Sequence, residues 1–332
     1  MNNQHQTVDK SVDKSVDKSV DKSVDKSVDK SVDKSFDKSG DGLHRHLAYF
    51  NAQRLKPSGP AGRTPANLHE QRLTLALQED FVERERAKVT EIARAVPSDH
   101  AGFIAWFTDL REHGEGQNDP LFSWLAEDST IEDMRWFLTQ EAAGEAGFDD
   151  LVALTQVKMP TRPKLEMARN YWDEMGRGQE AGMHGGLLER VSRFLDLPIA
   201  IDSTVWPSLA LSNLMIALAT ERHYAYHSIG ALGVIEMTAP GRVAAVAAGL
   251  RRLGVPAPEC LYFDLHATLD LKHSLAWNSE VIAPLIELDP RVAPWIAEGA
   301  LMRLNAGARC FRRYRAQLRV GVATSDGVTV DR

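Results

Sequence analysis

The chain has 332 residues, with 39 lysines and arginines against 46 aspartates and glutamates, which gives a formal net charge of −7. This mildly acidic balance argues against a dedicated nucleic-acid-binding protein, which needs a basic surface for the phosphates. No stretch approaches about 18 consecutive apolar residues, so we expect no membrane-spanning helix. The N-terminus lacks an apolar core and predicts no secretory signal. Cys260 and Cys310 are too few for a disulfide framework, and we expect a cytoplasmic protein.

A tetrapeptide repeat runs from Val8 to Ser39, with VDKS seven times and then FDKS. A four-residue period drifts about 40° per repeat against the α-helix, so the valines form only a slowly winding stripe. With so little to bury, the sequence predicts a disordered low-complexity tail over residues 1–40. A docking or assembly tail is the functional alternative.

The remaining sequence predicts an all-α protein, because apolar residues recur at three- and four-residue steps and convincing alternating strands are absent. Ser129 and Glu132 form a capping-box pattern, and Pro207 suits the first turn of a long helix. We expect an N-terminal helical extension packed on a helical bundle, and then a frayed tail. These three parts span residues 41–118, 119–320 and 321–332. Helices are expected at about 68–95, 101–113, 129–148, 161–178, 185–195, 207–237, 241–254, 263–277 and 295–318.

The segment "FDLHATLDLKHSLAW" places His266, Asp270 and His273 at positions i, i+4 and i+7 of one helix. These positions fall within roughly 60° of arc, so the three side chains project from one stripe. Two imidazoles and a carboxylate that converge on one point suit a divalent metal ion. The alternative is a solvated polar face on an amphipathic helix.

Three further residues extend this candidate set. Glu236 lies inside the apolar run "IGALGVIEM", where a carboxylate is costly unless it is paired or bound to a metal. Its structural alternatives are a helix end that faces solvent or an ion pair with Arg242. Glu174 and His184 are separated by three glycines, so they could converge from either side of a turn or flank an ordinary loop.

An acidic stretch before them, "TQEAAGEAGFDD", spaces Glu141, Glu145 and Asp149 four residues apart, and hence on one helix face. The plainer interpretation is an exposed acidic stripe. If one carboxylate points inward, Glu145 is the preferred choice, because alanine and glycine surround it.

Taken together, six of these residues resemble the ligand set of the heme-oxygenase-like diiron oxidases and oxygenases, a group that includes the iron-containing redox enzymes. The family pattern is a Glu and a His from one region, a lone Glu on the next long helix, and H-x3-D-x2-H on a third. The resemblance covers about residues 120 to 320, including "FLTQEAAGEAGFDDLVALTQV" and "NYWDEMGRG". Some members add a carboxylate from the preceding helix, a part that Glu145 or Glu141 could play. The pattern is filled in order by Glu174, His184, Glu236, His266, Asp270 and His273.

The resemblance implies a heme-oxygenase-like helical bundle that binds two Fe(2+) ions per chain. It implies an enzyme that uses O2 to oxidise a small amine- or carboxylate-bearing metabolite, with an external electron donor as one option. A homodimer stays open, and neither nucleic acid nor a membrane is expected as a partner. Independently, mixed imidazole and carboxylate ligands suit iron or manganese better than structural zinc. The alternatives are a haem oxygenase or cofactor-free relative, for which one axial His suffices, and a non-enzymatic helical binding protein.

Overall fold

The computed structural model describes residues 40–59, 65–144 and 146–321. Every regular element within these ranges is helical, which confirms the all-α prediction. The VDKS repeat, Glu145 and residues 322–332 lie outside the described residues. Contacts group residues 44–332 into one unit, and every contact discussed below lies within it.

The helices follow one another along the described residues in three parts. The N-terminal part holds α2 (Asp41–Leu55), α3 (Pro65–Ala87), α4 (Thr90–Arg94) and α5 (His100–His113). The middle part holds α6 (Pro120–Glu127), α7 (Ile131–Gly144), α8 (Phe148–Thr155), α9 (Thr161–Glu174), α10 (His184–Phe194) and α11 (Trp206–Thr220). The C-terminal part holds α12 (Ala225–Arg252), α13 (Leu261–Ala276), the π-helix η6 (Trp277–Ile282), α14 (Ala283–Leu288) and α15 (Ala293–Leu318). Short 3-10 turns lie between several of them, including η1 (Gly176–Gly178), η2 (Glu180–Gly182) and η4 (Arg222–Tyr224).

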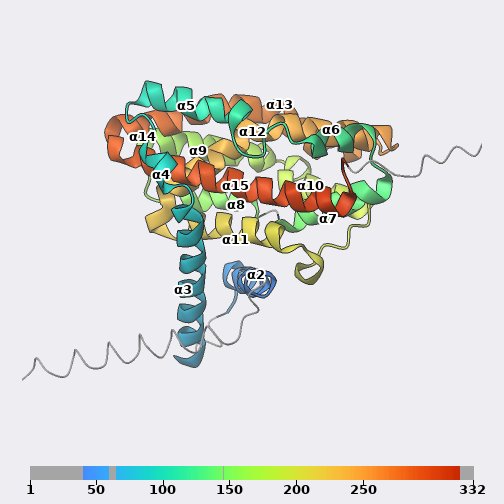
Figure 1. Ribbon diagram of the computed structural model, residues 1–332, viewed down its shortest axis with the longest axis horizontal. Helices are drawn as coiled ribbons and strands as arrows, with labels where there is room; N and C mark the ends of the chain where they lie inside the picture. The colour runs from blue at the N-terminus through green and yellow to red at the C-terminus, as the bar shows by residue number, and fades with distance from the viewer. Residues whose placement is uncertain (1–39, 60–64, 145, 322–332) are drawn as a thin grey trace, which may run out of the picture. The chain divides into compact units, whose positions relative to one another are not determined.

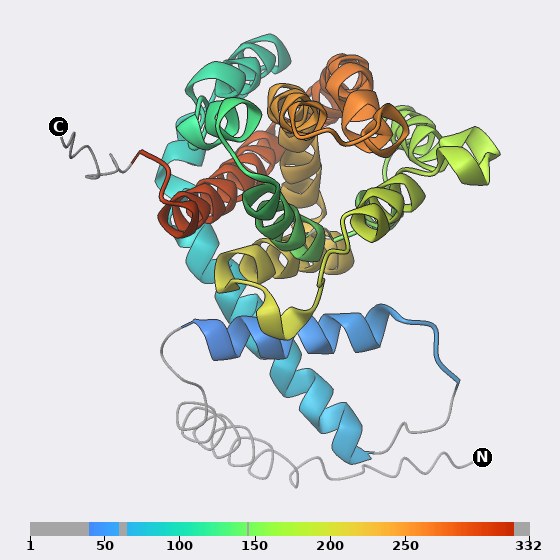
Figure 2. The same ribbon diagram turned by 90° about the vertical axis from the view of Figure 1, so that its right-hand side faces the viewer.

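Helix α12 lies at the centre of the bundle and packs against α13, α15, α6 and α11 (Figures 1 and 2). Glycines permit the close approach of α12 and α15. A Cβ atom on Gly230 would lie 1.8 Å from the carbonyl oxygen of Ile296, and one on Gly299 would lie 1.8 Å from that of His227. Two helices in such contact exclude larger side chains at both positions.

The segment Arg222–Arg252 is also the one helix among the described residues that is long and apolar enough to cross a membrane, and its apolar 18-residue window has a mean hydropathy of 1.3. Within the protein, 61% of this apolar window is buried. Packing on α13 and α15 accounts for its apolar surface. The absence of a membrane span therefore stays a prediction.

Two predicted long helices are wrong, because each is interrupted, and polar contacts to other helices lie at both interruptions. The helix expected at 68–95 breaks between α3 and α4, where Glu298 of α15 accepts hydrogen bonds from Arg86 Nε at 2.8 Å and Thr90 Oγ1 at 2.9 Å. The helix expected at 207–237 breaks at Glu221, which is extended and pairs with Arg54 of α2 at 3.3 Å. The second piece, α12, then continues to Arg252 and absorbs the helix expected at 241–254.

The predicted capping box is displaced by one residue. Thr130 Oγ1 accepts from the Asp133 backbone N–H at 3.2 Å, and Asp133 Oδ2 accepts from the Thr130 backbone N–H at 2.9 Å. The Ser129 hydroxyl donates instead to the carbonyl oxygen of Leu125 at 2.7 Å, at the end of the preceding helix. Pro207 lies in the first turn of α11, as predicted.

The N-terminal helices are attached to the bundle through buried polar contacts. Asn51 of α2 donates to Asn213 of α11 at 3.0 Å, and Asn213 donates to the carbonyl oxygen of His44 at 2.9 Å. Arg309 of α15 pairs with Glu85 of α3 at 3.0 Å. In Figure 1, α3 runs across the direction of α11 and α15.

Candidate metal centre

The turn between α9 and α10 brings Glu174 and His184 together. Glu174 is the last residue of α9 and His184 the first of α10. An antiparallel bridge pairs Met175 with Met183, which closes the loop between them. Gly176 has φ +60°, and a Cβ atom there would lie 2.4 Å from the carbonyl carbon of Gly182, so this turn requires glycine. The predicted convergence across a turn is thereby confirmed.

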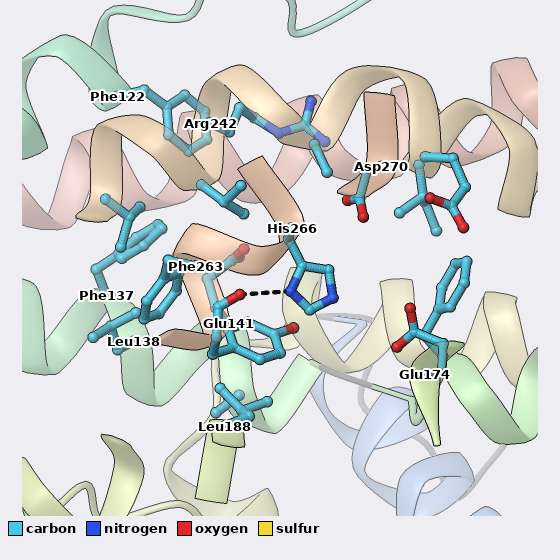
Figure 3. Close-up of a pocket in the computed structure, with 18 of the residues that line it drawn as sticks. Phe122, Phe137, Leu138, Glu141, Glu174, Leu188, Arg242, Phe263, His266 and Asp270 are labelled. Atoms are coloured by element: carbon cyan, nitrogen blue, oxygen red, sulfur yellow. Dashed lines mark hydrogen bonds between the residues drawn. The ribbon is translucent and has the colours of Figure 1, made fainter. Parts of the chain in front are cut away.

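His266 of α13 completes the first group of three residues, which we call triad A: Glu174, His184 and His266. His184 Nδ1 lies 2.7 Å from Glu174 Oε2 and 3.2 Å from His266 Nε2. His266 Nδ1 donates to the carbonyl oxygen of Tyr262 at 2.7 Å, the dashed line in Figure 3. Burial lowers the pKa of His266 and outweighs the charge of Glu174, which raises it. The ring is therefore neutral, with its Nε2 lone pair directed at the other two residues.

The second group, triad B, joins two neighbouring helices: Glu236 of α12 with Asp270 and His273 of α13. His273 Nδ1 lies 3.5 Å from Glu236 Oε2, and His273 Nε2 lies 3.1 Å from Asp173 Oδ2. Burial would lower the pKa of His273, but Glu236 and Asp173 outweigh it and raise the pKa to about 9. Asn170 Nδ2 donates to Glu236 Oε1 at 2.5 Å, which orients that carboxylate.

Both triads have the donors that a divalent metal ion needs. In each, one donor atom per residue lies within 4.8 Å of the others. Asp270 Oδ1 and His273 Nδ1 are buried, and neither has a hydrogen-bond partner among the described residues. Burial first, and then the charges of Glu236 and Glu174, raise the pKa of Asp270 to about 10. Without a metal ion, protons on Asp270 and His273 therefore offset the negative charge of the cluster, and a bound cation would do so in their place.

The structure thus brings all six predicted ligands into two adjacent groups. Glu236 is only 2% exposed, so the solvent-facing interpretation is wrong for this residue. The described residues also hold no ion pair between Glu236 and Arg242, and α12 continues for sixteen residues past Glu236. Pro240 stands four residues after Glu236 and has no N–H to donate to the Glu236 carbonyl group.

A cavity of about 160 Å³ adjoins both triads. Figure 3 shows His266 between an apolar side, with Phe137 and Leu138, and a polar side, with Glu174 and Asp270. The walls come from α6, α7, α8, α9, α10, α12, α13 and α15. They are formed by Phe122, Phe137, Leu138, Glu141, Ala142, Phe148, Glu174, Leu188, Ile235, Glu236, Ala239, Arg242, Val243, Val246, Tyr262, Phe263, His266, Asp270 and Arg303.

Glu141 departs from the predicted exposed acidic stripe, because it lines this cavity. Its Oε1 accepts a hydrogen bond from Tyr314 Oη at 2.9 Å. Burial raises the pKa of Glu141 against the charges of Arg303 and Arg242. Glu145, the preferred inward carboxylate, lies outside the described residues, so its part in the site stays a prediction.

Three supporting residues could not be singled out from the sequence. Asp173 and Asn170 share α9 with Glu174, and Tyr262 precedes His266 by one helical turn. The only sign of Asp173 in the sequence is that it stands next to Glu174 in "NYWDEM". Neighbouring positions on a helix point about 100° apart, so the sequence did not indicate that both acids face the site. Tyr262 contributes a backbone carbonyl group, which no sequence pattern reveals.

A protein-family model described as iron-containing redox enzyme matches residues 135–308 of this chain. The chain belongs to the iron-containing redox enzyme family. The matched range includes all six residues of triads A and B and more than half of the chain, and it confirms the resemblance noted in the sequence. Membership in this family supports iron binding and an oxidoreductase activity. No match to a curated protein was found.

Proposed function

We propose that this protein is a non-haem diiron oxidase or oxygenase that uses O2 to oxidise a small metabolite. The observation that carries the proposal is the pair of adjacent triads, each with imidazole and carboxylate donors, beside one cavity. Helical bundles build dimetal sites in this way from side chains that face inward on several helices. Two ferrous ions held there would supply two electrons to O2 together.

The chain's own residues have distinct parts in this proposal. Triad A would hold one iron ion and triad B the other, with Asp270 and Glu174 close enough to affect each other electrostatically. The Tyr262 carbonyl group and Asp173 fix the rings of His266 and His273, so that Nε2 of one and Nδ1 of the other face the metal positions.

The apolar walls have the second part. Phe137 and Leu138 of α7 and Phe263 of α13 line the cavity and limit the entry of water. Exclusion of water strengthens the electrostatic interactions at the site and protects a reactive species from side reactions. The substrate would lie against these walls, next to the two triads.

The size of the cavity favours this function over that of a haem oxygenase. Pockets for drug-sized ligands enclose roughly 300–1,000 Å³, whereas this cavity encloses about 160 Å³. A haem oxygenase would also use one axial histidine and leave triad B without a function. A non-enzymatic binding protein would leave all six residues without one.

The cytoplasmic location predicted from the sequence is also a proposal. Cys260 and Cys310 are both free and buried, and burial raises the pKa of each thiol. Raised thiol pKa values make both groups unreactive. Free thiols suit a reducing cytoplasm, where we propose that the enzyme acts.

Iron counting and O2 uptake test the proposal. The full chain, stripped with a chelator and reloaded with ferrous iron without air, should bind two iron ions per chain. A pulse of O2 should then be consumed, and the spectrum should change to that of ferric iron. The matched control is His100→Ala, a change of an exposed histidine far from the triads in sequence, which should leave both results intact. Binding of haemin with a Soret band, and no binding of iron, would refute the proposal.

A further inference from the structure

Arg242 presents a half-buried cation to the cavity. It lies on α12, and its Cζ atom is 5.9 Å from the ring centroid of Phe122 and 5.6 Å from that of Phe311. Its Nη2 donates to Thr238 Oγ1 at 3.1 Å. Within the described ranges of the chain, this is its one hydrogen bond, and no carboxylate there forms an ion pair with it.

Such an arrangement leaves the cation incompletely satisfied. A guanidinium group has five N–H donors, and a charge that is partly removed from water is stabilised when it gains a partner of opposite charge. Burial, and then the charge of Arg303, lower the pKa of Arg242 to about 10, which still leaves it protonated at neutral pH. Arg303 lines the same cavity.

Glu141 lines the same part of the wall and forms no ion pair with Arg242. Glu141 already accepts a hydrogen bond from Tyr314, and burial raises its pKa towards the neutral form. An ammonium group would therefore find a weak partner in Glu141 and repulsion from Arg242. A carboxylate would instead be attracted to Arg242, where two parallel N–H groups of the guanidinium can donate to its two oxygens.

The position of Arg242 also links anion binding to the metal centre. The hydrogen bond to Thr238, one helical turn earlier, directs the side chain back towards Glu236. The cavity-lining face of α12 runs from Glu236 through Ala239 to Val246. A carboxylate at Arg242 would thus hold its attached carbon atoms beside the triads and its apolar body against Phe137 and Leu138.

We infer that the substrate is a small carboxylate with an apolar body, and that Arg242 binds its carboxylate group. The inference rests on the proposed function and narrows its substrate class. A cavity of about 150 Å³ holds benzene, and this one encloses about 160 Å³. The body of the substrate is therefore close to a benzene ring or a short alkyl chain in size.

Calorimetric titration of the full chain, loaded with ferrous iron and kept without O2, tests the inference. The probes form two matched sets: phenylacetate, phenylacetamide and 2-phenylethylamine, and hexanoate, hexanamide and hexylamine. At least one carboxylate should bind at millimolar concentration or below, and its amide and amine should bind at least tenfold more weakly. A hydrogen bond to a charged group contributes about 1.5–3 kcal/mol, so Arg242→Gln should weaken carboxylate binding about 10- to 100-fold.

Two controls make the result specific. Arg242→Lys keeps the positive charge but cannot form two parallel hydrogen bonds, so it should bind the carboxylate more tightly than Arg242→Gln and more weakly than wild type. Arg251→Gln removes an exposed arginine of the same helix, which pairs with Asp264, and should change nothing. Iron per chain, measured on every sample, reports on the proposed function separately. Absence of carboxylate binding to iron-loaded wild type, unchanged affinity in Arg242→Gln, or tighter binding of an amine would each overturn the inference.

Discussion

Two buried clusters of this protein contain the same residue types and differ in their source of positive charge. The Glu298 cluster consists of Glu298, His227, Arg86 and Thr90, and the other cluster is triad B. Glu298 is 3% exposed, and so is Asp270. In the Glu298 cluster, Oε2 accepts from Arg86 and from His227, each at 2.8 Å, and Oε1 accepts from Thr90 at 2.9 Å. In triad B, Asp270 Oδ1 has no partner among the described residues.

The protonation of the two carboxyl groups follows from this difference. Burial would raise the pKa of Glu298, but hydrogen bonds from His227, Arg86 and Thr90 outweigh it and lower the pKa. For Asp270, burial and the neighbouring carboxylates act in the same direction and raise the pKa to about 10. The permanent charge of Arg86 thus satisfies the Glu298 cluster, whereas triad B of the metal-free protein depends on protons that a metal ion could replace.

The largest expected effect separates the two clusters by their metal content. Asp270→Ala removes a ligand of triad B, so we expect iron to fall from two ions per chain to one or fewer. Glu298→Ala should leave two. Elemental analysis of both variants after anaerobic loading provides the measurement. Equal iron content in the two variants would remove the distinction between the clusters.

In the metal-free protein, the raised pKa values of triad B should make the free energy of unfolding depend on pH. Asp270 has a folded-state pKa of about 10 against an ordinary value of 3.8. Its protonated form thus stabilises the fold at low pH, and this stabilisation is lost as pH rises towards 10. His273, with a pKa raised to about 9 from 6.5, acts in the same direction above pH 6.5.

We therefore expect the free energy of unfolding of the metal-free protein to fall between pH 5 and 9, by up to about 1.4 kcal/mol per pH unit for each proton. Asp270→Asn should make the slope shallower and stabilise the metal-free protein at pH 8. Urea denaturation at several pH values provides the measurement. A wild-type stability that rises over this range would contradict the account of triad B.

The Glu298 cluster should instead contribute stability without any metal. Removal of one member of a buried ion pair leaves its partners unsatisfied and costs about 3 kcal/mol. Glu298→Ala should lower the free energy of unfolding by this amount, both with and without iron. Glu287→Ala, at an exposed position, is the control. A loss of stability in Glu298→Ala that disappeared on iron loading would mean that this cluster also depends on metal.

The smallest effect concerns a residue that supports a ligand without contacting the metal position itself. Asp173→Asn weakens the hydrogen bond between position 173 and His273 Nε2 but keeps the side-chain volume. Loss of such a partner typically lowers metal affinity about 10- to 100-fold. Competition with a chelator should show this decrease, and Glu189→Gln, an exposed change on α10, should show none. An unchanged affinity in Asp173→Asn would mean that α13 alone positions His273.

The sequence, together with the family resemblance, was sufficient to predict which six residues lie in the two triads, and their binding of metal stays a prediction. The spacing of His266, Asp270 and His273 sets one helix stripe, and the glycines after Glu174 permit a turn that returns to His184. What the sequence could not show depended on distant partners. At the break at Glu221 the partner is Arg54 of α2, and at the break after α3 it is Glu298 of α15.

The same reasoning explains the errors in the cavity. Glu141 was placed on an exposed stripe because its own helix contains other acids, but its surroundings come from Tyr314 and Arg242 on other helices.

Anomalous X-ray diffraction tests the central claim most directly. Crystals of the full chain, loaded with ferrous iron without air, should give two iron peaks. One should lie about 2.1 Å from His266 Nε2 within triad A, and the other at a similar distance from His273 Nδ1 within triad B. A single peak, or iron bound only to exposed carboxylates with both triads empty, would contradict the account.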